Sequence, residues 1–403
     1  MRSIPLDEIT VEVLNGLIGT ESEGKRLEFK STVPGKGEDE KAEFLKDVSA
    51  LANSDGGDII YGMAEVKGIA SALLPVDTSS LDAEMLRLNQ ILDGGIRPRI
   101  PGVEMRPITI EPTKSVLLVR IPLSHLGPHQ VTAGQSYRFH GRNAAGTYPI
   151  EIDELRDIIL RHASLPEQMR DFRRDRVMLI RDHPEDIASP VEYERKLIVH
   201  YMPEQTFGRF GSANSELFTN TQLRRRIEQL GAPTIAELGL SYRSNIEGYV
   251  FMNGLATDVL KFYVQVFNNG AVEFVDAAAF RISTNEPFIY HETLEQTLFR
   301  QFYFARELLS VMGVEGRVAV YASALGIRDC TIKPQAPTRQ IHFTGHSAAI
   351  GRDPAFFNSI MIEDMNAADP QTALEPLIQQ FWRASAYDHA YSYKDGKYVG
   401  RNW

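Results

Sequence analysis

The sequence predicts a mixed fold of helices and strands, divided between two domains that an arginine-rich helix joins. The chain has 403 residues, which is long enough for two or three domains. Apolar residues recur both at helical spacing and in strand-like alternation. The expected elements follow one another too irregularly for a doubly wound nucleotide-binding fold, which needs regular βα alternation. The expected fold class is therefore mixed α+β, with a second mixed α/β domain after the first.

The first domain is expected over residues 1–162. Apolar residues at helical spacing predict an opening helix over 6–17 and another over 39–53. Gly56 and Gly57 then act as a helix stop, since glycine accepts the left-handed conformation. The remaining elements expected here are strands at 27–31, 58–62, 103–110, 116–121 and 136–140, and helices at 81–92 and 153–161.

Residues 163–184 are expected to form a linking helix, and residues 185–403 a second α/β domain. The linking helix carries five arginines against four acids, so we interpret its arginines as surface residues paired with neighbouring carboxylates. The expected elements of the second domain are strands at 196–201, 248–252, 259–267, 272–280 and 317–321, and helices at 223–230, 294–311 and 373–387.

Composition sets limits on the class of protein. Hydrophobic residues make up 43% and charged residues 24%, as in ordinary soluble proteins. No apolar run reaches the roughly 20 residues that a membrane-spanning helix needs. The net charge of −10 does not itself indicate nucleic-acid binding, although an acidic protein can carry a local basic groove. A single cysteine, Cys330, permits no internal disulfide and leads us to expect a cytoplasmic protein.

The densest polar chemistry lies between Glu23 and Glu65. In the strand Leu27-Glu28-Phe29-Lys30, alternation sends Glu28 and Lys30 to the same face. Glu23 precedes Glu28 by five residues, and two carboxylates near one lysine can hold a divalent cation against a phosphate. The segment therefore suggests phosphodiester chemistry. The alternative is an exposed charge pair, worth under about 1 kcal/mol.

Three segments together resemble the Schlafen-type AlbA domain. They are Glu23 with Leu27-Glu28-Phe29-Lys30, then Asp47-Val48-Ser49-Ala50-Leu51-Ala52-Asn53-Ser54-Asp55-Gly56-Gly57, then Ile59-Ile60-Tyr61-Gly62. A closing segment from Tyr137-Arg138 to Glu154-Leu155 is also similar to that domain, so the resemblance covers about residues 15–162. It implies an AlbA-like fold for the first domain.

The resemblance also implies a function. In vertebrate Schlafen proteins the equivalent domain is an endoribonuclease that cuts tRNA and rRNA with three acids and a divalent metal. Glu23 and Glu28 match the spacing of two of those acids, and Glu65 stands where the family has an aspartate. The implied metal, Mg²⁺ or Mn²⁺, would be held by Glu23, Glu28 and Glu65, with Lys30 as phosphate stabiliser.

The resemblance further implies nucleic acid, RNA rather than DNA, as the partner, and a role in bacterial phage defence, either as a homo-oligomer or with a partner protein. A non-catalytic nucleic-acid-binding module, such as a transcriptional regulator or a subunit of a defence complex, stays open as an alternative. ATP binding is a third alternative, although the chain has no Gly-Lys-Ser or Gly-Lys-Thr of a P-loop.

Two arginines are candidates for nucleic-acid contact. Arg138 and Arg142 alternate with aromatic residues in the stretch from Tyr137 to Arg142, a pattern that suits phosphate contact and base stacking. The same pattern is typical of a β-hairpin with buried aromatic side chains and solvated cations. Both interpretations stay open on sequence alone.

Overall fold

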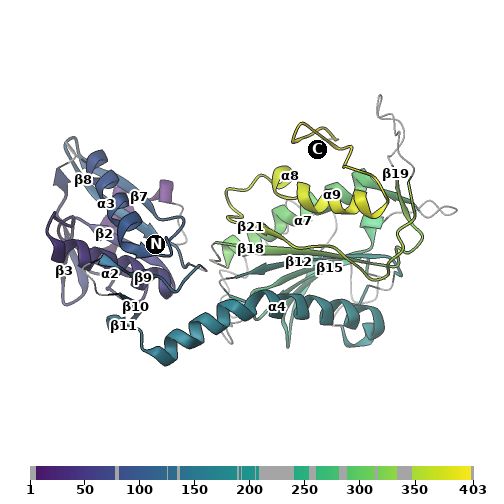
Figure 1. Cartoon of the computed structure of the whole chain (residues 1–403), viewed down its shortest axis with the longest axis horizontal. Helices are drawn as coiled ribbons and strands as arrows, with labels where there is room; N and C mark the ends of the chain where they lie inside the picture. Colours follow the sequence, from purple (N-terminus) through teal and green to yellow (C-terminus); the bar gives the residue numbers. More distant parts are fainter. Residues whose placement is uncertain are drawn as a thin grey trace. The chain divides into compact units, whose positions relative to one another are not determined.

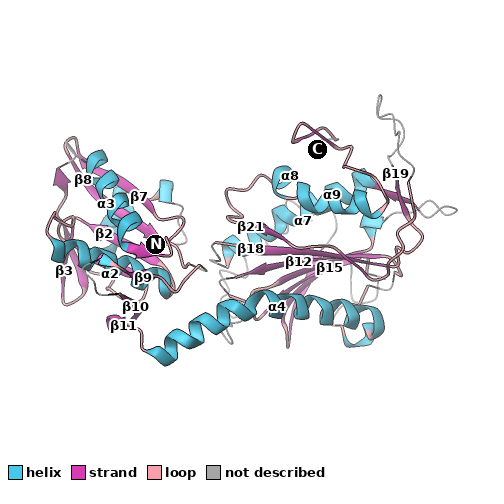
Figure 2. Ribbon diagram, viewed as in Figure 1, coloured by secondary structure: helices cyan, strands magenta, loops and turns pink. Residues whose placement is uncertain are grey.

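The protein is described from a computed structural model in which contacts divide the chain into two units, Met1–Ser164 and Leu165–Trp403. Figure 1 follows the chain through both units and Figure 2 shows their helices and strands. The described residues are 6–77, 81–124, 126–133, 137–187, 190–191, 193–204, 206–207, 240–253, 260–280, 288–312, 314, 316–333 and 347–400.

A central sheet buried on both faces forms the core of the first unit. Its strand order is β1-β2-β8-β5, with β7 also paired to β8. Ile59 and Tyr61 of β2 pack with the apolar stripe of α2, whereas Ile60 packs with Leu14 and Leu17 of α1 on the other face. The period of two in these strands thus fills two apolar layers. The sheet strands are β1 (Leu27–Lys30), β2 (Gly57–Tyr61), β5 (Val76–Asp77), β7 (Glu104–Glu111) and β8 (Lys114–Ile121).

A second, four-stranded sheet in this unit has the order β11-β10-β9-β6, and helix α2 contacts β9, β10 and β11. A hairpin, β3–β4, completes the unit. The first unit's other elements are η1 (Leu6–Glu8), α1 (Val11–Leu17), α2 (Glu38–Asn53), α3 (Leu81–Gly95), β3 (Met63–Val66), β4 (Ile69–Leu73), β6 (Ile96–Arg97), β9 (Gln130–Val131), β10 (Arg138–Asn143) and β11 (Gly146–Pro149).

The glycine pair after α2 behaves as the sequence predicts. Gly56 has a φ of +65°, and its N–H donates to the carbonyl of Leu51 at 2.8 Å, which closes the helix. A Cβ on Gly57 would lie 2.6 Å from the carbonyl oxygen of Arg26. The pair therefore ends α2 and lets β2 approach the turn before β1.

The second unit is built on an antiparallel sheet of eight strands among the described residues, in the order β13-β14-β15-β16-β12-β18-β20 with β21 also on β18. Helices α7 and α9 pack on one face and the second half of α4 on the other. The strands of this sheet are β12 (Lys196–Pro203), β13 (Leu240–Asn245), β14 (Gly248–Asn253), β15 (Phe262–Phe267), β16 (Val272–Asp276), β18 (Val318–Leu325), β20 (Ala355–Phe356) and β21 (Ile360–Ile362).

The structure confirms the long helix expected at 294–311. The helix expected at 373–387 is shorter than predicted and spans Glu375–Ala384. The described helices and remaining strands of this part are α4 (Ile152–Asp182), η3 (Pro184–Asp186), η5 (Ala278–Phe280), α7 (His291–Val311), α8 (Pro370–Ala373), α9 (Glu375–Ala384), β17 (Phe288–Tyr290), β19 (Thr331–Lys333), β22 (Tyr393–Lys394) and β23 (Lys397–Tyr398). The helix expected at 223–230 lies outside the described residues.

Helix α4 corrects two expectations. The helices expected at 153–161 and 163–184 are one continuous helix that contains Pro166. Proline removes one helical hydrogen bond, but Leu165 and Met169 are buried in an apolar cluster that holds this turn in place. The chain division between Ser164 and Leu165 falls inside this helix.

The sequence pattern led us to expect all the arginines of α4 on the surface, but the structure buries some of them. Arg174 does pair with Asp171 at 3.0 Å and is largely exposed. Arg173 and Arg176, in contrast, are buried. The Arg176 guanidinium binds both carboxylate oxygens of Glu273, at 2.9 and 3.0 Å, beneath the sheet. Helical spacing places acids beside both sets of arginines, so sequence alone does not distinguish them.

Candidate nucleic-acid interface and acidic cluster

Strand β1 places Glu28 and Lys30 as the alternation predicts. It runs parallel to β2, with Glu28 beside Ile59 and Lys30 beside Tyr61. Phe29 points into the core and is 3% exposed, whereas Glu28 and Lys30 are partly exposed on the opposite face. A carboxylate and an ammonium therefore project together from a rigid element of the sheet.

Two cations already bind the Glu28 carboxylate. Lys30 Nζ lies 3.1 Å from Oε1, and Arg142 Nη2 donates to Oε2. The Arg142 guanidinium also donates to the carbonyl oxygens of Gly24, at 2.8 Å, and Leu27, at 3.2 Å. Its side chain is 3% exposed. Arg142 therefore connects β10 to the turn that enters β1 and neutralises Glu28 from inside the domain.

The Lys30 ammonium lies among three carboxylates. Besides Glu28 it contacts Glu43 Oε1 at 2.8 Å and Asp47 Oδ2 at 3.3 Å. Desolvation lowers the pKa of Lys30, but the bond to Glu43 and the charges of Asp47 and Glu28 outweigh it and raise the pKa above its ordinary value. Lys30 therefore stays protonated and holds the cluster together.

Glu43 and Asp47 are members of this cluster that the sequence did not single out. They are four residues apart on α2, so they share one helix face. Asp47 is 3% exposed, and burial raises its pKa while Lys30 opposes the shift. The spacing of four residues indicates that the two carboxylates share a helix face, but nothing in the sequence shows that this face packs against β1.

Glu23 and Glu65 flank the cluster. Glu23 Oε1 accepts the Phe29 N–H at 2.9 Å, while Glu65 is exposed and accepts the Gly68 N–H in the β3–β4 turn. Burial raises the pKa of Glu23, the Phe29 N–H lowers it, and the charges of Glu28 and Glu65 raise it further. The three glutamates therefore share one electrostatic neighbourhood.

The three glutamates do not form a ready ligand set for a divalent ion. Their carboxylate oxygens do not all lie within 4.8 Å of one another, as the ligands of one metal ion would. Among the described residues, a group that is this close is His183, Glu185 and Asp186. Both Glu28 oxygens are bonded to cations, and Glu23 and Glu65 each accept a backbone N–H. In this arrangement the residues do not fit Mg²⁺ or Mn²⁺, which needs several free oxygen ligands.

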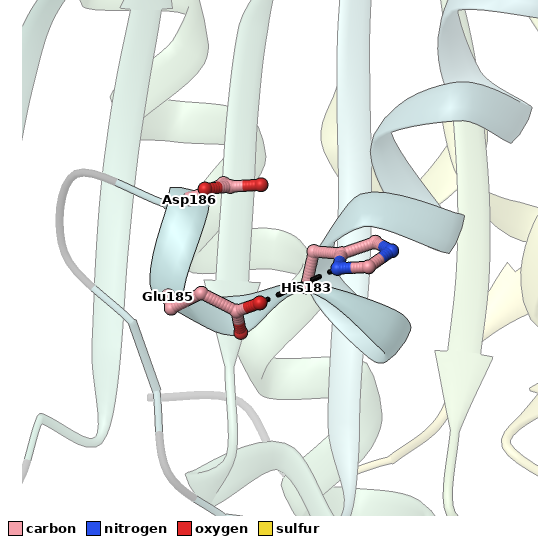
Figure 3. Close-up of side chains that lie close together, drawn as sticks. All are labelled: His183, Glu185 and Asp186. Carbon is pink, nitrogen blue, oxygen red and sulfur yellow. Dashed lines mark hydrogen bonds and ion pairs between the residues drawn. The ribbon is translucent and has the colours of Figure 1, made fainter.

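The group His183, Glu185 and Asp186 belongs to the second unit and is shown in Figure 3. Its residues are close in sequence, across the end of α4 and the short η3 turn, and all three are exposed. His183 Nδ1 lies 3.3 Å from Glu185 Oε1. Local chain geometry alone brings these side chains together, so we assign them no function.

An open groove lies between α2 and the β9–β10 sheet, and we call it the α2–β10 groove. It has a volume of about 490 Å³, within the range of ligand sites. Arg138 lines it, together with Lys46 and His140, while Arg142 is buried beside Glu28. The two arginines predicted to contact nucleic acid therefore occupy different environments. The complete lining is Glu38, Asp39, Ala42, Glu43, Lys46, Val131, Ala133, Arg138 and His140.

Asn53 fixes the geometry of this groove. Its amide donates to the carbonyls of His129, at 2.9 Å, and His140, at 3.0 Å, and its Oδ1 accepts the His129 N–H at 2.7 Å. The next residue, Ser54, accepts the Arg142 N–H at 2.7 Å. The end of α2 is therefore fastened to β10 by side chains from two consecutive residues.

These features define the first unit as a mixed α/β domain with an ion-paired acidic cluster beside a polar groove. Residues 23–151 match the family model described as Schlafen, AlbA_2. The first unit is thus a Schlafen AlbA_2 domain, as the sequence motifs predicted, and this membership indicates a nucleic-acid-related role.

Among solved structures, one similar protein is DIP2311 from Corynebacterium diphtheriae, with 16% sequence identity and a TM-score of 0.25. The match covers 36% of this chain and 27% of DIP2311, so the chain spans about a quarter of that protein's length. The comparison with curated proteins finds no match. In the described part of the chain, no helix combines the length and the apolar character needed to cross a membrane.

Proposed function

We propose that the first unit binds nucleic acid through the α2–β10 groove. The observation that carries this proposal is the convergence of Lys46, Arg138 and His140 on one open groove of a Schlafen AlbA_2 domain. Arg138 and His140 lie two residues apart on β10 and so share a face. Lys46 reaches the same groove from α2. Cations and N–H groups placed in this way suit the oxygens of a phosphodiester backbone.

The acidic cluster next to this groove is compatible with binding of nucleic acid, and binding needs no catalytic role for its carboxylates. Arg142 and Lys30 together offset two of the three negative charges of Glu28, Glu43 and Asp47, so the cluster repels a polyanion less than its count of carboxylates suggests. This local compensation lets a protein with a net charge of −10 present a groove for nucleic acid.

Removing the groove cations is expected to weaken binding and to reduce its dependence on salt. Lys46→Ala and Arg138→Ala should each lower the affinity for a single-stranded oligonucleotide on the order of tenfold. Each should also reduce the slope of log K against log salt by about 0.7. Fluorescence anisotropy across a salt series measures both quantities.

Arg174→Ala is the matched control, because Arg174 is an exposed arginine of the second unit paired with Asp171. Its affinity and its salt slope should equal those of the wild type. An Arg138→Ala protein that kept the wild-type slope would remove Arg138 from the interface and contradict the proposal.

A metal-dependent endonuclease is the second candidate, favoured by the shared neighbourhood of Glu23, Glu28 and Glu65 next to Lys30. For this function the Glu28 carboxylate would have to be released from Arg142, so that its oxygens could help to hold Mg²⁺ or Mn²⁺. This second proposal also includes the choice of substrate, which is RNA rather than DNA and in particular structured RNA such as tRNA. It includes a role in phage defence and assembly as a homo-oligomer or with a partner protein.

If the second candidate holds, the purified chain with Mn²⁺ should cut tRNA and Glu28→Gln should abolish the cleavage. Glutamine keeps the shape of the side chain and an oxygen for Arg142, so loss of activity would not reflect unfolding. Glu21→Gln, two residues before Glu23 and exposed, is the control that should stay active. Intact tRNA after prolonged incubation with the wild type would reject cleavage while leaving binding in place.

A further inference from the structure

The α2–β10 groove combines hydrogen-bond donors with carboxylates, and their chemistry identifies the part of a nucleic acid that it fits. The donors are Lys46 of α2 and Arg138 and His140 of β10. The carboxylates are Glu38, Asp39 and Glu43, from the first turns of α2. Ala42, Val131 and Ala133 provide apolar lining. A ligand that fits this groove must combine an anion, an apolar body and hydrogen-bond donors.

His140 contributes a neutral donor. Desolvation lowers its pKa, and the charges of Lys46 and Arg138 lower it further, so the ring is neutral at pH 7. Its Nδ1 is buried and makes no hydrogen bond within the described part of the chain. An unpaired buried N–H is less tolerated than an unpaired lone pair, which places the proton on Nε2. The donors of the groove are therefore two cations and one neutral N–H.

Among the carboxylates of the groove, Asp39 is the one best able to accept a hydrogen bond from a ligand. Glu43 binds Lys30 at 2.8 Å, and Glu38 binds Lys41 at 2.7 Å. For Asp39 the described residues provide neither an ion pair nor a side-chain hydrogen bond, and its side chain is exposed. Carboxylates recognise the exocyclic amino group of a base such as cytosine. Uracil lacks that amino group and presents carbonyl oxygens on either side of its N–H.

We propose that the groove holds one unpaired nucleotide of a single strand and prefers a base that carries an amino group. Its phosphate lies against Lys46, Arg138 and His140, and its amino group donates to Asp39. The volume of about 490 Å³ suits a single nucleotide, whereas a duplex keeps its bases stacked and paired away from such a groove. This inference rests on the proposed binding of nucleic acid and adds the class of substrate to it.

The test compares oligo(C), oligo(U) and a fully paired RNA hairpin of matched length in fluorescence anisotropy with the full chain at one salt concentration. We expect oligo(C) to bind about tenfold more tightly than oligo(U), and the hairpin to bind more weakly than oligo(C). Asp39→Asn should bring the ratio of oligo(C) to oligo(U) affinity close to one.

Asp82→Asn is the matched control, since Asp82 is an exposed aspartate in the first turn of α3 and does not line the groove. It should retain the wild-type ratio. Equal affinity of the wild type for oligo(C) and oligo(U) would overturn the preference while leaving nucleic-acid binding intact. If none of the three ligands bound, the proposed function itself would fail, and the preference with it.

Discussion

Arg142→Ala is expected to destabilise the first unit by about 2–4 kcal/mol, because it removes the buried one of the two cations that bind Glu28 and leaves only Lys30. Arg142 also donates to the carbonyls of Gly24 and Leu27, so the substitution removes bonds to the turn before β1. Hydrogen exchange followed by mass spectrometry measures the effect directly. Amides of β1 and β10 should lose protection in the variant.

Two internal controls make this result specific. Both tryptophans, Trp382 and Trp403, lie after residue 164, so the tryptophan fluorescence transition reports on the second unit and should not move. Arg138→Ala on the same strand removes an exposed guanidinium and should change stability by no more than about 0.5 kcal/mol. Unchanged protection of β1 in Arg142→Ala would show that Arg142 does not anchor the site.

Arg176→Met should destabilise the second unit by a similar amount, about 3–5 kcal/mol. Arg176 binds both oxygens of the fully buried Glu273, and Glu273 also bonds to Tyr263 at 2.8 Å and to His200 at 2.9 Å. Methionine still packs on Phe267, over which the guanidinium lies at 4.8 Å, but it cannot compensate the carboxylate. Urea denaturation monitored by tryptophan fluorescence measures the loss.

The comparison variant is Arg174→Met, two residues away on the same helix but exposed, which should lie within about 0.5 kcal/mol of the wild type. The double variant Arg176→Met with Glu273→Gln should recover part of the loss, since it removes the unpaired charge. Equal denaturation midpoints for Arg176→Met and Arg174→Met would contradict the buried ion pair.

The same network predicts how the second unit responds to acid. Although burial opposes it, Arg176 and His200 hold the pKa of Glu273 well below its ordinary value. The pKa of His200 is also below its ordinary value, and here burial is the cause. Both folded-state pKa values lie below the unfolded ones, so both groups stabilise the fold above their ordinary pKa values, about 4.3 and 6.5. That stability is lost as the pH falls. In Arg176→Met, the free energy of unfolding of the second unit should depend less steeply on pH below about 4.3. The reason is that the pKa of Glu273 is no longer held as low.

Local patterns predicted much of the fold of the first unit. Alternation placed Glu28 and Lys30 opposite Phe29, and the apolar stripe from Phe44 to Leu51 predicted α2. These features depend on residues within one or two turns of each other. The continuity of α4 through Pro166 was not predictable in this way, because it depends on burial against strands far along the chain.

The site was predictable only in part, for the same reason. The motif identified Glu28 and Lys30, but the ion pair of Glu28 with Arg142 joins residues 114 positions apart. The groove likewise brings Lys46 of α2 to Arg138 and His140 of β10. Pairings of this range are set by the tertiary packing of α2 on the second sheet, which no local spacing encodes.

The most direct test of nucleic-acid binding in the α2–β10 groove is a hydrogen-exchange footprint of the full chain with and without a single-stranded oligonucleotide. We predict increased protection in residues 38–46 and 130–142, with the eight-stranded sheet of the second unit unchanged. Tight binding that left both segments of the groove unprotected and protected other residues instead would contradict it.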